Sequence, residues 1–565
     1  MKNYKTKRIL AITLILLLLT GSSLVFLSFN NDDFKLVKSL EIYYSLFREL
    51  NLFYVDETDP EKLVESSIEG MLEELDPYTS FIPESEQDNF NFITTGQYGG
   101  IGALIRRNGN YAIIAEPYKD FPAYKNGLKA GDTILLIDGI SMKGKEISYI
   151  SDHLKGTPGT SVTITFRRIG VENEIEKTLI REKININNVP YYGMIDDKIG
   201  YIRLANFTTD AAKEVKNALT ELKQKHELNG IILDLRGNPG GLLIEAVDVA
   251  NLFIAYGQEI VSTKGRVNQW DYVYKTRSNP IDTNIPLAVL VSRSSASASE
   301  IVAGSVQDLD RGIIVGQRTY GKGLVQTTRN LAYNSKLKVT TAKYYIPSGR
   351  CIQALDFSNR NEDGSVGSIP DSLISEFKTK NGRNVYDGGG IVPDVTTTPA
   401  SLSQFTVSLY TQNIIFDYTT LFASRHNSIL PVPDFRITDE IYEDFINYVI
   451  NIDFTYSTKS EETLNQLIET AQQEKYYDLA SEEFVALGKK LAHDNMKDLN
   501  HFRNEISLLL KQEITKRYYH QWGAIESTIT EDEEINKALL VLKDKNQYLS
   551  ILSYDKEEVH ATLAE

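Results

Sequence analysis

The sequence contains a single cysteine, Cys351, and seven histidines among its 565 residues. One thiol excludes an internal disulfide framework, so cysteine usage does not report the redox compartment. The histidines form no H-E-x-x-H pattern and no C-x-x-C pair occurs, so no zinc site is recognisable. We therefore expect no metal and no cofactor, and we look for chemistry in other side chains.

An excess of positive charge is also missing. The 60 Lys and Arg residues face 76 Asp and Glu residues, for a net charge of −16. Nucleic-acid-binding proteins normally carry a clustered basic face, and no such cluster occurs, so we expect no nucleic-acid partner. Hydrophobic residues make up 42% and charged residues 24%, which is typical of folded soluble domains. The length favours roughly three or four such domains.

A long apolar run lies near the N-terminus. Basic residues within Met1–Arg8 precede the run Ile9–Phe29, and two acids follow at 32–33. A run of 21 almost entirely apolar residues can span a bilayer, and the charge pattern predicts an inner-membrane anchor with the body on the exported, periplasmic side. We expect residues 1–30 to form this signal or anchor transmembrane segment. Cleavage near residues 20–23 would give a secreted protein, and a buried soluble helix is the remaining alternative.

Sequence patterns divide the rest of the chain into four regions. We expect helices at 35–90, a small β-rich domain at 92–186, an α/β layered core at 187–400 and helices at 401–565. The predicted core elements are strands at 200–205, 230–235, 287–291 and 312–315, and helices at 210–225, 242–253 and 298–309. This alternation favours a layered α/β core within a multidomain α+β protein. The polar stretch 359–387 is expected to be a surface excursion.

A serine-rich segment, Ser294–Glu300, follows the strand candidate and opens an apolar helix. Ser297 therefore lies near a helix N-terminus, where free N–H groups and the helix dipole favour a developing negative charge. The N–H of Ala298 is a candidate oxyanion donor. The alternative is structural, because Ser297 and Glu300 also spell the S-x-x-E capping box. The competing nucleophile candidates are Ser294, Ser295 and Ser299.

Lys322 lies between two glycines in the segment Tyr320–Gly323. A hydroxyl and a neutral amine together can perform covalent hydrolysis without histidine. Flanking glycines permit close backbone approach, and apolar neighbours favour the uncharged amine by excluding water. In an extended strand Gln326 would share a face with Lys322 and could hold its amine. The alternative is a surface lysine in a hairpin.

Two further glycine-containing segments need an interpretation. Asp234–Leu242 ends a strand and opens a helix, so the N–H of Gly240 or Gly241 could complete an oxyanion hole; a plain tight turn is the alternative.

Gly316–Gly323 nearly spells the phosphate-binding loop G-x-x-x-x-G-K-[ST]. Its last position is glycine, which lacks the magnesium-holding hydroxyl, so we set a nucleotide-dependent enzyme aside.

Taken together, these segments resemble the C-terminal processing peptidases, also called tail-specific proteases. The resemblance rests on Ser297–Glu300, Tyr320–Gly323 with Gln326, and Asp234–Gly241, and it covers residues from about 40 to 400. It implies a nucleophile at Ser297, a general base at Lys322 and an orienting amide at Gln326. It further implies oxyanion donors at Ala298 and at Gly240 or Gly241, of which Gly240 is the less favoured, and a supporting acid at Glu300.

The region 92–186 resembles the PDZ domain of that family. Gln97–Ile105 resembles its carboxylate-binding loop, in which successive N–H groups cradle a terminal carboxylate while the peptide adds as a strand. The peptide-binding positions implied are Tyr98, Gly99, Gly100, Ile101 and Gly102. A simple glycine turn is the alternative.

We therefore expect an exported serine endopeptidase that recognises protein C-termini through a PDZ domain and cleaves by a Ser–Lys mechanism. Its expected partners are proteins or peptides with exposed C-termini, and the membrane through the N-terminal helix. Self-association or partner docking through residues 401–565 stays open. The alternative function is a catalytically silent PDZ adaptor or chaperone.

Overall fold

The computed structural model describes residues 31–361, 363–399, 401–491 and 494–553. The chain forms two compact units, divided after Phe81. The predicted transmembrane segment, residues 1–30, lies outside the described residues. In the part of the chain that the structure does describe, no helix combines the length and the apolar character needed to cross a bilayer.

Between residues 31 and 81, the N-terminal unit contains the helices α2 (Asn31–Phe53) and α3 (Pro60–Glu73). The start of α3 follows from its sequence, because Asp59 accepts the N–H groups of Glu61 and Lys62 and proline takes the first helical position. A short strand, β1 (Ser80–Ile82), lies where the chain is divided.

The second unit begins with α4 (Gln87–Thr95), which ends at Gly96 in the left-handed conformation. A β-rich domain follows, with antiparallel strand order β3-β4-β5-β7-β8 and β6 beside β5. Its elements are β3 (Ala103–Asn108), β4 (Tyr111–Pro117), α5 (Pro122–Lys125), β5 (Thr133–Ile137), β6 (Ile140–Ser141), α6 (Ile147–Leu154), β7 (Ser161–Arg167) and β8 (Ile175–Ile180). β2 (Gln97–Gly100) pairs separately with β9 (Glu182–Asn185). β3 is therefore an edge strand of the domain's main sheet.

The predicted α/β core has a sheet of order β10-β11-β12-β15-β16-β23, in which every pair except β10–β11 is parallel. Its strands are β10 (Tyr191–Met194), β11 (Ile199–Arg203), β12 (Gly230–Asp234), β15 (Leu287–Val291), β16 (Ile313–Gly316) and β23 (Val395–Thr396). The helices α7 (Ala211–Lys225), α8 (Leu243–Asn251) and α9 (Ala298–Asp308) connect them. These bounds lie within about two residues of the predicted ones, because buried parallel strands are continuous apolar runs.

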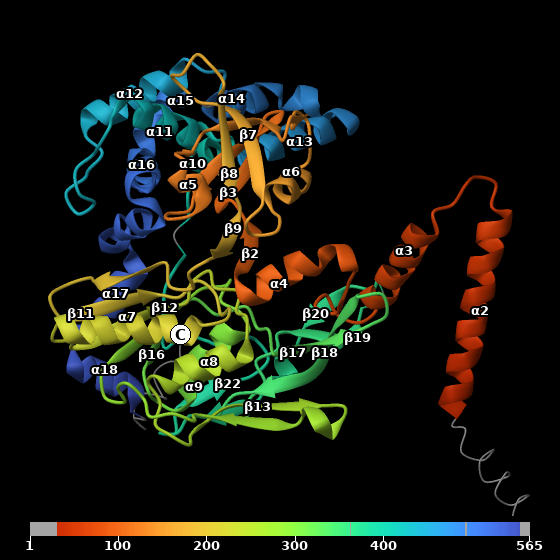
Figure 1. The fold of residues 1–565 in the computed structure, drawn as a ribbon. Helices are drawn as coiled ribbons and strands as arrows, with labels where there is room; N and C mark the ends of the chain where they lie inside the picture. The colour runs from red at the N-terminus through yellow and green to blue at the C-terminus, as the bar shows by residue number, and fades with distance from the viewer. Residues whose placement is uncertain (1–30, 362, 400, 492–493, 554–565) are drawn as a thin grey trace, which may run out of the picture. The chain divides into compact units, whose positions relative to one another are not determined.

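Alternate residues of these strands pack against different helices. Leu287, Val289 and Val291 of β15 join the cluster that contains α7, α8 and α9. Ala288 and Leu290 join a second cluster, which contains α17 (Glu533–Lys543) and α18 (Lys545–Leu552). Because strand side chains alternate between faces, the C-terminal helices cover the opposite face of the core sheet (Figure 1).

An antiparallel sheet of β17, β18, β13 and β14 lies beside the core. Its strands are β13 (Glu259–Gly265), β14 (Tyr272–Lys275), β17 (Leu324–Asn330) and β18 (Lys336–Tyr345). The polar stretch 359–387, which we expected to be a surface excursion, contains regular structure. That stretch takes part in two small hairpins, β19 (Leu355–Arg360) with β20 (Val366–Ser368) and β21 (Glu376–Lys378) with β22 (Asn384–Tyr386).

The tail is helical, as predicted. Its remaining helices are α10 (Gln404–Thr411), α11 (Ile414–Arg425), α12 (Asp439–Ile450), α13 (Lys459–Gln473), α14 (Ser481–Leu491), α15 (Asn495–His501) and α16 (Arg503–Glu526). One apolar cluster joins α10, α11, α12, α15 and α16. The last two helices, α17 and α18, pack instead on the core sheet. The tail therefore contributes both a helical domain and part of the core.

Candidate active site

The serine-rich segment forms a tight elbow between β15 and α9. Ser297 has φ 54° and ψ −112°, a conformation that residues with a Cβ rarely adopt. An ordinary N-cap residue has extended backbone, so this geometry differs from plain helix capping. The predicted capping box is nevertheless present, and in it the Ser297 N–H donates to Glu300 Oε2 at 2.8 Å. The Ser297 side chain is half-buried at this elbow.

The competing serines are placed differently. Ser295 is fully buried, and its hydroxyl donates to Leu235 O at 2.7 Å. Ser299 is also fully buried, and its hydroxyl donates to Asn238 O at 3.0 Å. Ser294 is exposed and shares a hydrogen bond with Ser292. Two of the three hydroxyls therefore hold the elbow against the 234–242 loop.

Glu300 is a buried carboxylate that joins the serine elbow to the lysine turn. Oε2 accepts the N–H of Ser297 and the N–H of Lys322 at 2.9 Å. Oε1 accepts the N–H of Gly321 at 2.7 Å and the hydroxyl of Thr319 at 2.5 Å. An ionised carboxylate offers about four acceptor positions, so all four donors are satisfied only when Glu300 is charged.

Burial raises the pKa of Glu300 to about 7, against the lowering effect of its hydrogen bonds from Thr319, Lys322, Gly321 and Ser297. The charged and the protonated forms of the Glu300 carboxyl are therefore close in free energy near neutral pH. Desolvation opposes its charge, while the donors around it require that charge.

A second buried group connects the same two segments. Tyr344 of β18 is 1% exposed, and its hydroxyl lies 2.6 Å from Lys322 O and 3.2 Å from Ser297 O. Sequence reasoning missed this residue, since nothing in a β-run marks the tyrosine that will meet two loops. Thr319 was missed for the same reason.

The glycines beside Lys322 are required by packing. Gly321 has φ 85°, and a Cβ there would lie 2.4 Å from Ala354 Cβ. A Cβ on Gly323 would lie 2.8 Å from the backbone nitrogen of Gln353, whose Oε1 accepts the Gly323 N–H at 2.8 Å. The chain on both sides of Lys322 is thus pressed against a neighbouring segment, and Lys322 itself is half-buried.

Gln326 does not share a continuous strand with Lys322, so the extended-strand premise of the face-sharing argument does not hold. β17 begins at Leu324, and its register shifts between Val325 and Gln326. The Gln326 amide nitrogen donates to Thr340 Oγ1 at 3.2 Å.

The 234–242 loop lies directly against the nucleophile elbow. A Cβ on Gly240, which has φ 99°, would lie 2.6 Å from Ala296 O and 2.9 Å from Ser297 Cβ. Ala296 N–H donates to Asn238 O at 3.1 Å. The N–H of Gly240 already donates to Asn238 Oδ1 at 2.9 Å. Asn238 was not singled out from the sequence, although the glycine-rich motif that contains it was.

The predicted peptide-binding residues are only partly a loop. Tyr98, Gly99 and Gly100 belong to β2 and pair with Ile184, Lys183 and Glu182. Ile101 and Gly102 lie between β2 and the edge strand β3, and Gly102 has φ 71°. The N–H groups of Ile101 and Gly102 therefore lie outside the strand pairing of both β2 and β3, directly before the edge strand β3.

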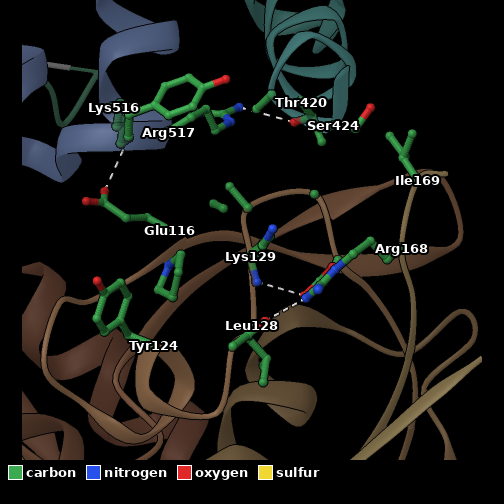
Figure 2. Close-up of a pocket in the computed structure, with 18 of the residues that line it drawn as sticks. Glu116, Tyr124, Leu128, Lys129, Arg168, Ile169, Thr420, Ser424, Lys516 and Arg517 are labelled. Carbon is green, nitrogen blue, oxygen red and sulfur yellow. Dashed lines mark hydrogen bonds and ion pairs between the residues drawn. The ribbon is translucent and has the colours of Figure 1, made fainter. Parts of the chain in front are cut away.

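A cavity of about 620 Å³ lies elsewhere, between the β-rich domain and the helices α11 and α16 (Figure 2). Its charged lining is largely paired: Lys516 Nζ lies 3.3 Å from Glu116 and Arg168 Nη2 lies 2.7 Å from Asp132. None of the predicted site residues lines it. Among the described residues, no three His, Cys, Asp or Glu side chains are grouped as metal ligands would be.

Sequence models of known families match three parts of the chain. Peptidase family S41 matches residues 198–359, a PDZ domain matches 113–168, and "Probable PDZ-protease, C-terminal helical domain" matches 405–542. The helical tail, which lay outside the recognised motifs, therefore has a family match of its own.

A carboxy-terminal-processing protease of Bartonella bacilliformis is 37% identical over 349 residues, covering 61% of this chain and 77% of the relative. The chain belongs to the carboxy-terminal-processing proteases of peptidase family S41. It is a serine-type peptidase with a PDZ domain, which confirms the predicted resemblance and enzyme class.

Two further proteins are similar to this chain. A "Probable CtpA-like serine protease" of Staphylococcus haemolyticus is 34% identical and covers 64% of this peptidase and 71% of the relative. The solved photosystem II D1 C-terminal processing protease is 28% identical and covers 64% of this peptidase and 93% of that chain, with a TM-score of 0.34.

Proposed function

We propose that Ser297 is the nucleophile of this peptidase and Lys322 its general base. One observation carries the proposal: a single buried carboxylate, Glu300, accepts the backbone N–H of both residues. Tyr344 links their carbonyl groups as well. Two independent groups therefore fix the serine elbow and the lysine turn next to each other.

In this mechanism neutral Lys322 accepts the Ser297 hydroxyl proton while Oγ attacks the carbonyl carbon of the substrate. The peptide C–N bond breaks, the lysine returns the proton to the leaving amine, and an acyl-enzyme ester remains. Lys322 then takes a proton from water and the hydroxide attacks the ester carbon. The bond from that carbon to Ser297 Oγ breaks, the new C-terminus leaves, and Lys322 returns the proton to Oγ. Gln326 is proposed to orient the lysine amine.

The oxyanion would be held by the N–H of Ala298 and of one glycine in the 234–242 loop. Gly241 is the better candidate, because the N–H of Gly240 already donates to Asn238. The close approach of Gly240 to the Ser297 side chain supports the placement of this loop beside the reacting carbonyl.

The proposed substrates are proteins with exposed C-termini. Ile101 and Gly102 would cradle the terminal carboxylate, and the substrate would extend as a strand along β3, the free edge of the sheet. We further propose that the enzyme is exported and held at the membrane by residues 1–30. The support for this location is the basic segment before the apolar run.

The test uses an unfolded, tagged protein with an apolar C-terminus, and identifies the products by mass spectrometry. Wild type and the control Ser294→Ala should yield the same fragments, and Ser297→Ala should yield none. The same protein with an amidated C-terminus should show a higher KM, because the PDZ domain loses its anionic anchor. Equal cleavage by wild type and Ser297→Ala would show that the nucleophile is elsewhere.

A further inference from the structure

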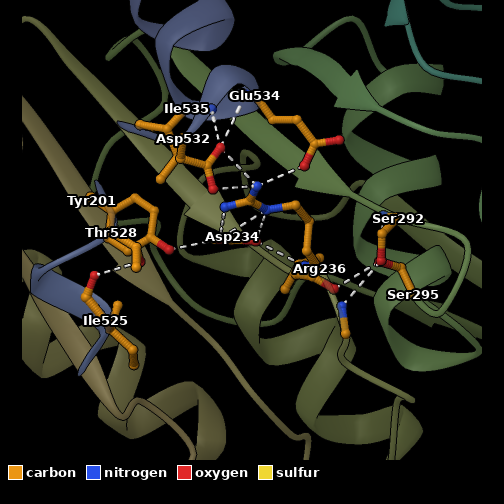
Figure 3. Close-up of polar contacts among 12 residues, drawn as sticks. Tyr201, Asp234, Arg236, Ser292, Ser295, Ile525, Thr528, Asp532, Glu534 and Ile535 are labelled. Carbon is orange, nitrogen blue, oxygen red and sulfur yellow. Dashed lines mark hydrogen bonds and ion pairs between the residues drawn. The ribbon is translucent and has the colours of Figure 1, made fainter. Parts of the chain in front are cut away.

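The first turn of α17, in the C-terminal region, contacts the loop that carries the oxyanion glycines. Arg236 Nη1 lies 2.8 Å from Asp532 and 2.6 Å from Glu534 (Figure 3). The same guanidinium donates from Nη2 to Asp234 at 2.7 Å. One cation is therefore shared by three carboxylates, two of which belong to the C-terminal helix.

This cluster is largely shielded from water. The side chain of Arg236 is 14% exposed, that of Glu534 is 14% exposed and that of Asp234 is fully buried. Buried ion pairs are poorly screened, and removing one partner leaves an uncompensated charge. The contact is therefore directional and strong enough to fix the backbone at position 236.

The backbone on either side of Arg236 is tied to the nucleophile elbow. Leu235 O accepts the Ser295 hydroxyl, and Asn238 O accepts the N–H of Ala296. Gly237 N–H donates to Ser292 Oγ at 3.1 Å. A shift of Arg236 would thus move the oxyanion loop and the segment that presents Ser297 together.

Glu534 also reaches the lysine side of the site. Its Oε1 accepts the Gln317 amide at 3.0 Å and the Thr397 hydroxyl at 2.7 Å. Gln317 begins the segment that continues through Thr319 to Lys322. One glutamate of α17 therefore contacts both active-site loops, through Arg236 and through Gln317.

Helix α17 packs on the core sheet through buried apolar residues. Ile535, Ala538 and Val541 are buried against the core sheet in the cluster that includes Ile232 and Leu290. Asp532 caps the helix by accepting the N–H groups of Glu534 and Ile535. The turn that carries both carboxylates is consequently held by packing and by its own cap.

We propose that Asp532 and Glu534 are positioning residues for catalysis: they hold Arg236 and Gln317, and with them the oxyanion loop and the lysine turn. This inference rests on the proposed function. It gives the C-terminal region a role in the chemical step, separate from substrate capture by the PDZ domain.

The test compares kcat and KM of four full-length variants on one peptide substrate: Glu534→Gln, Asp532→Asn, Arg236→Gln and the double variant Arg236→Gln/Glu534→Gln. Asparagine at 532 keeps the helix cap. Glu533→Gln is the matched control, because Glu533 is exposed in the same turn. Thermal unfolding of each variant reports folding, and Ser297→Ala in the same assay reports whether the activity belongs to the proposed site.

The expected result is a fall in kcat of at least about tenfold for Glu534→Gln and Asp532→Asn, with KM unchanged, since small misplacements of reacting groups are costly. The loss of kcat in the double variant should be smaller than the product of the two single losses, because Glu534 acts in part through Arg236 and in part through Gln317. The proposal is overturned if both single variants match Glu533→Gln, or if the losses of Arg236→Gln and Glu534→Gln multiply. Activity that survives Ser297→Ala would instead reject the proposed function.

Discussion

The N–H of Lys322 donates to Oε2 of Glu300 at 2.9 Å, and that oxygen also accepts the N–H of Ser297. The proposed base and the proposed nucleophile are therefore held through one side chain. Glu300 is a member of the capping box of α9, and it also connects the serine elbow to the lysine turn.

Replacing Glu300 by glutamine should reduce kcat strongly and should also lower the free energy of unfolding. The amide has one oxygen where the carboxylate has two, so it cannot accept all four donors, and each buried donor left without a partner costs about 1–3 kcal/mol. A tenfold or larger fall in kcat is expected, measured with a peptide substrate. Glu227→Gln, at an exposed position, is the control and should match wild type.

The raised pKa of Glu300, about 7, predicts a pH-dependent stability. Because the folded state binds a proton more tightly than the unfolded state, the folded protein is favoured at low pH and loses that stabilisation as pH rises from about 4.5 to about 7. The loss should amount to roughly 3 kcal/mol in the free energy of unfolding. Denaturant unfolding across this range should show it for wild type, and the difference should vanish in Glu300→Gln.

Substituting Gly240 should impair the chemical step. Alanine there would place its Cβ 2.9 Å from Ser297 Cβ on a backbone with φ 99°. Displacement of the nucleophile by a fraction of an ångström should lower kcat about 100-fold. Gly237→Ala is the matched control, since Gly237 has φ 72° in the same loop but open space around it. Equal kcat values for the two variants would contradict the proposed placement.

The contact between the PDZ domain and the helical region makes a separate prediction. A Cβ on Gly131, which has φ 92°, would lie 2.2 Å from Thr420 Cγ2 of α11, whereas one on Gly139, with φ 80°, meets nothing. Both substitutions strain the backbone, but only Gly131→Ala should also push the two regions apart. We expect it to cost roughly 1–3 kcal/mol more than Gly139→Ala. Hydrogen exchange should rise in α11 for Gly131→Ala alone.

Local patterns predicted the elements of the core but not the connections between them. β15 follows from its buried apolar run and α9 from the small-residue stretch that opens it, and both were placed to within about one residue. The role of Glu300 could not be read in the same way. Three of its four donors come from Thr319, Gly321 and Lys322, which reach it only once β16 has paired with β15.

Two further features depend on tertiary structure alone. The link from Tyr344 to both loops requires β18 to lie beside them. The contact of Glu534 with Arg236 joins positions almost 300 residues apart in sequence. The strand argument for Gln326 did not hold for a local reason, because Lys322 lies before β17, which begins at Leu324.

The most direct test of the central claim is the initial rate of peptide cleavage by Lys322→Ala, with Lys343→Ala as the control at an exposed lysine of β18. Loss of a general base should slow cleavage by about 10²–10⁴-fold, while the control keeps the wild-type rate. If Lys322→Ala is folded and cleaves as fast as Lys343→Ala, Lys322 is not the base and the serine–lysine account is wrong.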